Sequence, residues 1–216
     1  MAFLRTRLAL TLTALFAAAV AGGCASSGYQ QAGKTSDQMG SLKVELEKGA
    51  NQIDATIASL NGLVGAADLP KAFKAYSTEV NKLDAQAKRV GKTADEMEKK
   101  GGAYFAAWEK KTANISNVQM RAKAAERRAA LTASFERIGE AYGKLDDSYP
   151  ALMADLKDIE SFLSSELTGD SVDAISDQMD KSGTDAETVK AAIVDVTQVI
   201  DDVVREFGRQ APPPEA

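Results

Sequence analysis

The sequence contains no histidine and only one cysteine among its 216 residues. The absence of histidine excludes a Ser-His-Asp triad, a Cys-His pair and the common histidine-ligated zinc sites in this chain. A single cysteine excludes a disulfide within the chain. Positive charge is not in excess either, because the formal net charge is −5 and the pI is about 5.0. This balance argues against nucleic acid as a partner bound through bulk charge.

Proline is also scarce. Three of the five prolines lie at 212–214, and only Pro70 and Pro150 fall inside the body of the chain. Because a proline inside a helix costs about 3 kcal/mol, long stretches without proline favour long helices. Apolar residues recur every three or four positions, and no segment alternates apolar with polar residues as a strand does. The sequence therefore predicts an all-α fold, an elongated antiparallel bundle with coiled-coil-like packing.

Five segments carry this helical spacing, three of them long: 35–64, 69–113, 116–163, 170–180 and 184–207. Capping boxes at Thr35, Ser116 and Thr184, and an N-cap at Asp68, predict four of the helix starts. Gly183 is predicted to separate the two C-terminal helices. The turn after the second helix is predicted at 114–117, with 101–102 as the alternative. Aromatic residues on the apolar stripes are predicted to be core: Tyr76, Tyr104, Trp108, Phe135, Tyr142 and Tyr149.

The N-terminus has the pattern of an export signal. Arg5 and Arg7 precede an apolar run from residue 8 to residue 20, which is too short to span a membrane comfortably. Small residues then lead to Cys24, an arrangement that resembles a bacterial lipobox, although Ala21 stands where leucine is usual. The alternative is an incidental thiol in an ordinary signal peptide. Ala25, rather than aspartate, follows the cysteine, and the resemblance then implies the outer membrane, facing the periplasm.

These features divide the chain into four parts. Residues 1–23 are predicted to be a lipoprotein signal peptide, and 24–34 a lipidated flexible tether of small polar residues. The helical bundle is predicted to cover 35–208, and 209–216 to form a proline-rich tail.

Charge is unevenly distributed along the body. Residues 68–128 hold 14 basic and 8 acidic side chains, whereas 140–206 hold 5 basic and 17 acidic ones. One interpretation is internal, with the acidic helices packing beside the basic ones. The other is external, with a basic cluster binding an anionic partner such as cell-wall polymer or lipid headgroups. The cluster consists of Arg121, Lys123, Arg127 and Arg128.

Residues 28–35 match the phosphate-binding pattern G-x-x-x-x-G-K-[ST] letter for letter. That chemistry needs a strand before the loop and a sheet behind it, so that backbone N–H groups converge on phosphate. The sequence offers neither, and we reject a nucleotide site at Lys34.

Residues 70–180 resemble a family of bacterial lipoproteins known as domain of unknown function 2959. The residues that carry the resemblance are Tyr104-Phe105-Ala-Ala-Trp108-Glu109, the basic helix start from Arg121 to Arg128, and Pro150-Ala-Leu152. The family continues with Lys-His-Asn-Leu-Asn-Ala, where this chain has 164–169 and only Leu167 agrees. The resemblance implies no known activity.

Two functions are compatible with these observations. The first is a lipid-anchored, non-catalytic structural or protein-interaction lipoprotein of the cell envelope, without a cofactor. Its partners would be the membrane, through the lipid, and an envelope protein or cell-wall polymer; self-association stays open. The alternative is an envelope enzyme, or a bundle that binds a ligand or metal. That alternative calls for carboxylates on the buried seams, and the predicted seams hold none.

Overall fold

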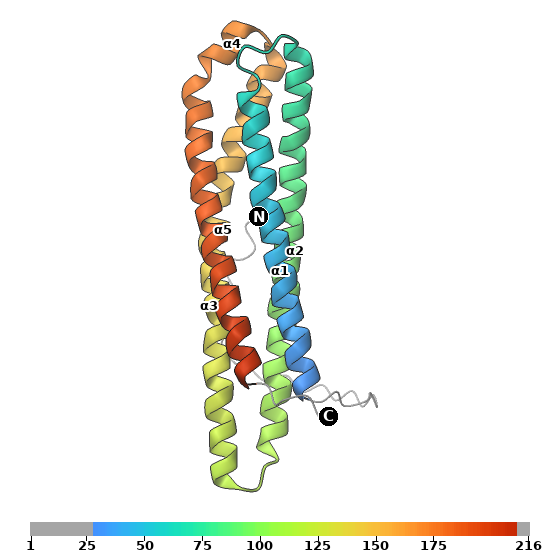
Figure 1. Ribbon diagram of the computed structural model, residues 1–216, viewed down its shortest axis with the longest axis vertical. Helices are drawn as coiled ribbons and strands as arrows, with labels where there is room; N and C mark the ends of the chain where they lie inside the picture. The colour runs from blue at the N-terminus through green and yellow to red at the C-terminus, as the bar shows by residue number, and fades with distance from the viewer. Residues whose placement is uncertain (1–27, 211–216) are drawn as a thin grey trace.

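The computed structural model describes residues 28–210 and contains four long helices and one short helix. They are α1 (Gly28–Asn61), α2 (Leu69–Ala113), α3 (Val118–Ser165), α4 (Gly169–Ala174) and α5 (Ser176–Gln210). The long helices run alternately up and down to form an elongated bundle, and α4 crosses one end of it (Figure 1). α1 and α3 each pack against both α2 and α5. The predicted all-α antiparallel bundle is confirmed, with four long helices where the sequence predicted three.

Local signals place the boundaries of α2 and the start of α3. Asp68 caps α2, its side chain accepting a hydrogen bond from the Lys71 N–H at 3.0 Å. α2 ends at Ala113, so the turn predicted at 114–117 is confirmed and the alternative at 101–102 is wrong. Asn117, rather than Ser116, caps α3 by accepting from the Met120 N–H at 3.1 Å. α3 continues through Pro150, as predicted.

The predicted break at Gly183 is wrong. α5 runs through this glycine without interruption, and the chain bends instead at Ile175, between α4 and α5. Thr184 does not cap a helix, because its hydroxyl donates to the Asp180 carbonyl one turn earlier. A helical glycine costs about 1 kcal/mol relative to alanine. Burial of Met179 and Ala186 on the same stripe offsets that cost.

The first helix also begins earlier than predicted. Residues 28–34 belong to α1 rather than to a flexible tether, and Thr35 lies inside the helix. The Thr35 hydroxyl donates to the Gln31 carbonyl at 3.0 Å, and Ala32 and Thr35 are both buried. The apolar stripe therefore extends further along α1, but through residues too small or too polar to be recognised as part of it. The predicted signal peptide, Cys24 and residues 211–216 lie outside the described residues.

One hydrophobic core runs along the bundle axis. At the end where α1 begins, the rings of Phe105, Phe135 and Phe207 close it, with centroids 5.8 Å apart for Phe105–Phe135 and 6.1 Å apart for Phe105–Phe207. The predicted seam placed Tyr104 and Trp108 in the core. Both are only half-buried, because the seam of α2 passes from Gly101 to Phe105 instead.

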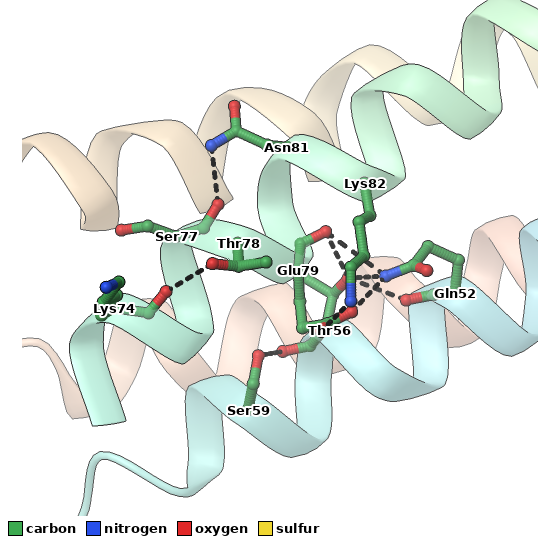
Figure 2. A network of polar contacts seen from close by, with 9 residues as sticks. All are labelled: Gln52, Thr56, Ser59, Lys74, Ser77, Thr78, Glu79, Asn81 and Lys82. Atoms are coloured by element: carbon green, nitrogen blue, oxygen red, sulfur yellow. Dashed lines mark hydrogen bonds and ion pairs between the residues drawn. The ribbon is translucent and has the colours of Figure 1, made fainter. Parts of the chain in front are cut away.

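Two polar clasps join α1 to α2. In the first, Gln52 of α1 donates from Nε2 to Glu79 Oε2 of α2 at 2.7 Å and, more weakly, to the Glu79 carbonyl at 3.4 Å (Figure 2). Lys82 donates to the other carboxylate oxygen of Glu79 at 2.7 Å. Buried Thr56 lies beside this clasp, its hydroxyl 2.7 Å from the Gln52 carbonyl oxygen.

The second clasp repeats the first with the two helices exchanged. Gln86 of α2 donates from Nε2 to Glu45 Oε2 and to the Glu45 carbonyl of α1, both at 2.9 Å. Lys48 donates to the other Glu45 oxygen at 2.7 Å. Both helices supply the same motif, Glu-x-x-Lys-x-x-x-Gln, at 45–52 and at 79–86. The α1–α2 pair thus has a local pseudo-twofold symmetry that fixes its register.

Candidate functional site

One end of the molecule adds no fully buried residue to the core. No residue between Phe105 and Leu131 is buried, although this stretch comprises the end of α2, the turn and the first three turns of α3. We call residues 106–130 the hairpin arm. The arm projects past the ends of α1 and α5, so it forms one tip of the bundle (Figure 1). Since only Trp108, at the base of the arm, packs against the core, contacts within the arm must stabilise the rest of it.

Polar contacts join the two helices of this hairpin. Arg128 of α3 donates to Glu109 Oε1 of α2 at 3.0 Å, and Arg121 donates to the Ile115 carbonyl in the turn at 3.2 Å. Trp108 lies half-buried at the base of the arm, against the Tyr104 ring, with the centroids 5.7 Å apart. Two members of the basic cluster, Arg121 and Arg128, therefore have a role inside the arm.

The outer surface of the arm is basic and partly apolar. The arm contains six basic and two acidic residues, a formal charge of +4. Lys110 and Lys123 are exposed, and Val118 and Met120 at the tip are 67% and 61% exposed. The start of α3 holds no acidic residue in its first turn, although a helix N-terminus favours negative charge. The four residues of the predicted basic cluster thus lie together on the arm.

A second feature is a cavity of about 260 Å³ in the middle of the bundle. All four long helices line it, and most of its wall is apolar, including Leu46, Ile53, Leu83, Leu145, Val189 and Ile193. Exposed Lys88 and Asp95 stand among the lining residues, so the cavity reaches the surface beside α2. Its apolar wall suits a small apolar molecule.

Small residues explain why this space is empty of side chains. Gly49 of α1, together with Ala87 and Gly91 of α2, lines the cavity. A Cβ atom at Gly91 would meet only the Tyr142 hydroxyl, at 3.8 Å. At Gly101, by contrast, the Phe135 ring occupies the space of the missing side chain.

Two tyrosines stand in the cavity wall. Burial raises the pKa of Tyr142 to about 12, with Asp146 and Asp95 acting in the same direction. Burial also raises the pKa of Tyr149, whose hydroxyl lies 3.4 Å from the Leu83 carbonyl oxygen and 3.3 Å from the Met153 sulfur. Both phenols are therefore neutral at physiological pH, and they can donate a hydrogen bond but cannot serve as a general base there.

Carboxylates in the described part of the chain do not converge. No group of three or more acidic or cysteine side chains within 28–210 could hold a metal ion. Several acidic residues instead form ion pairs between helices, such as Asp201 with Lys43 at 2.7 Å and Glu206 with Arg137 at 2.9 Å. These pairs join the acidic α5 to α1 and α3. Neither Lys43 nor Arg137 belongs to the basic stretch 68–128, so these pairs do not place the acidic helix beside the basic one as the internal interpretation predicts.

The string that matches a phosphate-binding loop is helical. Residues 28–35 form the start of α1, with Lys34 exposed. The described residues contain no strand or sheet beside this segment, so the strand–loop–helix context that a phosphate-binding loop needs is missing from 28–210.

Sequence reasoning found the basic cluster but not the arm that presents it. The missing signal was in the spacing: residues 118–130 lack the apolar repeat, which resumes only at Leu131. The cavity had a signal too, since the small residues Ala87 and Gly91 stand one turn apart on α2. Cys24 lies outside the described residues.

None of the helices within 28–210 is both long and apolar enough to cross a membrane. No match is found among curated proteins or among solved structures. A family match covers residues 28–207, which is more than the 70–180 that the sequence motifs suggested and includes all five helices. The chain therefore belongs to the family described as "Protein of unknown function (DUF2959)".

Proposed function

We propose that this protein is a lipid-anchored, non-catalytic structural or protein-interaction lipoprotein of the bacterial cell envelope. The observation that carries the proposal is the placement of Cys24, the sole cysteine, after an apolar run and small residues and only four positions before α1 begins at Gly28. A lipid on this residue would join a rigid bundle to a membrane almost directly. Two or three acyl chains suffice for stable anchoring.

The non-catalytic part of the proposal is supported by the character of the bundle. Acidic side chains such as Asp201 and Glu206 form surface ion pairs, and the half-buried Tyr142 stays neutral. The hairpin arm gives it a surface that is not needed for the core and is available for interaction. Ala25 after the cysteine supports the outer membrane, facing the periplasm, as the location.

Acylation of Cys24 is tested by labelling in cells. We expect palmitate label in the wild-type chain and none in Cys24→Ser, which should move from the membrane pellet to the soluble periplasmic fraction. Ala25→Asp is the matched control, because it keeps the cysteine and should keep the label while moving the protein to inner-membrane density. Equal labelling of the wild type and Cys24→Ser would contradict the proposal.

The central cavity favours a second candidate function, binding of a small apolar ligand. Its volume of about 260 Å³ and apolar wall are the supporting observations. The probe is N-phenyl-1-naphthylamine, whose fluorescence rises in an apolar site. Ala87→Leu should fill the cavity and abolish the signal, whereas Ala85→Leu, at an exposed position two residues away, should leave it unchanged. An equal signal from both variants would place the probe elsewhere and remove this candidate.

A further inference from the structure

We infer that the hairpin arm rests on the anionic headgroups of the same membrane that holds the Cys24 lipid. The inference depends on the proposed function, because it takes the lipid as the anchor. It adds an orientation, in which the bundle stands on the membrane by its arm end, and it assigns the arm surface to a lipid partner.

The arm and the anchoring residue belong to the same end of the bundle. Gln38 of α1 accepts a hydrogen bond from Lys100 of α2 at 2.5 Å, so these stretches of the two helices lie side by side. From there, α1 runs back ten residues to Gly28 while α2 runs on to Ala113, and both travel in the same direction (Figure 1). Four residue steps separate Gly28 from Cys24 and span at most about 14 Å. A lipid on Cys24 would therefore enter the membrane close to the arm.

The exposed side chains of the arm match such a surface. Val118 and Met120 are two of the six large apolar residues that are strongly exposed in the described chain, and they lie two positions apart at the tip. Exposed Lys110 and Lys123 flank them. Apolar residues surrounded by cations are typical of segments that lie at an anionic lipid interface.

Charge along the bundle favours the same orientation. The arm carries +4, whereas residues 166–180 at the opposite end hold five acidic residues and no basic one. An anionic membrane attracts the first end and repels the second. The attraction falls off within about 10 Å of the surface at ordinary ionic strength. A lipid anchor beside the arm would keep the basic side chains of the arm within that distance of the membrane.

The test uses the acylated full chain reconstituted into vesicles of phosphatidylethanolamine mixed with phosphatidylglycerol. Met120→Cys carries an environment-sensitive nitrobenzoxadiazole label, and the lipid occupies the Cys24 sulfur, so the introduced thiol is the reactive one. Val64→Cys is the matched control, because Val64 is 60% exposed and lies at the α1–α2 turn, at the other end of the bundle. We expect the label at 120 to shift to the blue and to lose quenching by aqueous iodide. The label at 64 should stay quenched.

Charge reversal completes the test without touching the apolar residues. Lys110→Glu with Lys123→Glu should restore iodide quenching of the label at 120. Lys71→Glu with Lys74→Glu makes the same charge change at exposed positions of the opposite end and should not restore it.

Flotation of the vesicles separates the two proposals. A chain that floats while its label at 120 stays as quenched as the label at 64 overturns the inference and leaves the lipid anchor standing. The same result excludes the membrane as partner of the arm in favour of a protein or cell-wall polymer. A chain that does not float contradicts the anchor, and the inference falls with it.

Discussion

The Phe135 ring of α3 occupies the space that a side chain at Gly101 of α2 would need. A Cβ atom added at Gly101 would lie 2.2 Å from the Phe135 Cζ atom and within 2.8 Å of two further ring atoms. No real Cβ contact is that short, so α3 and its ring hold their position only because residue 101 is glycine. Two helices thus approach closely at the level where the core closes.

Gly101→Ala should therefore destabilise the bundle, by about 1–3 kcal/mol, because the ring must leave its place in a packed core. Gly102→Ala is the control, since a Cβ there meets nothing within 4 Å. It should stabilise α2 by about 1 kcal/mol through helix propensity alone. Urea unfolding measures the free energy of unfolding of both variants. If Gly101→Ala stabilised the bundle as much as Gly102→Ala, the Phe135 ring would be free to move aside, and the prediction would be wrong.

The clasps between α1 and α2 should make stability depend on acid. Hydrogen bonds from Lys82 and Gln52 lower the pKa of Glu79 below its ordinary 4.5, and Lys48 and Gln86 do the same for Glu45. A carboxyl with a lowered pKa in the folded state stabilises the fold above the ordinary pKa. That contribution is lost as the pH falls below about 4.5.

Glu79→Gln should therefore make the urea midpoint of unfolding fall less steeply than in the wild type as the pH is lowered from 5 to 3. Glu47→Gln, at an exposed position of α1, removes a carboxylate that makes none of the clasp hydrogen bonds, so it serves as control and should keep the wild-type slope. A wild-type slope in Glu79→Gln would mean that the clasp is not formed in solution.

Phe105 and Trp108 should differ in their contribution to stability. Phe105 is buried in the core, and its replacement by alanine should cost about 3–5 kcal/mol. Trp108 is only half-buried, so Trp108→Ala should cost about 1–2 kcal/mol despite the larger ring. Thermal melting compares the two variants, and the reverse order would return Trp108 to the seam of α2.

ATP should not bind to residues 28–35. They form the start of a helix with no sheet beside it in the described part of the chain, and Lys34 is an exposed helical side chain. Equilibrium dialysis with labelled ATP and Mg²⁺ should give the same background for the wild type and Lys34→Ala. Micromolar binding that vanishes in the variant would contradict this prediction.

The helical periodicity of the sequence was enough to predict the fold class and the turn between α2 and α3, but glycine was ambiguous. Gly65 leaves the helix, with a φ of +66°, whereas Gly183 stays inside α5. Gly183 stands between Ser182 and Thr184, and only the stripe from Met179 to Ala186, which packs in the core, keeps the helix continuous there. Tertiary packing, which a local pattern does not contain, decided the second case.

The arm and the clasps could be predicted only in part. The basic residues of the arm stand out in the sequence, but its projection depends on how far α2 and α3 outrun α1 and α5, which is a property of the assembled bundle. For the clasps the signal was present, as the motif of Glu45 and Gln52 recurs at Glu79 and Gln86. Its meaning required the antiparallel pairing that places the two copies opposite each other.

The lack of buried residues between Phe105 and Leu131 has a consequence for hydrogen exchange. Opening the arm exposes little apolar surface, so its amides can exchange through local unfolding while the core stays closed. Amides of the core near Tyr76, which is fully buried and donates to the Leu156 carbonyl at 2.6 Å, exchange only when the bundle opens more widely. Docking of the arm on a surface would slow hydrogen exchange of the arm amides and leave the exchange rates of the core amides unchanged. Exchange in the arm therefore measures whether the arm is bound.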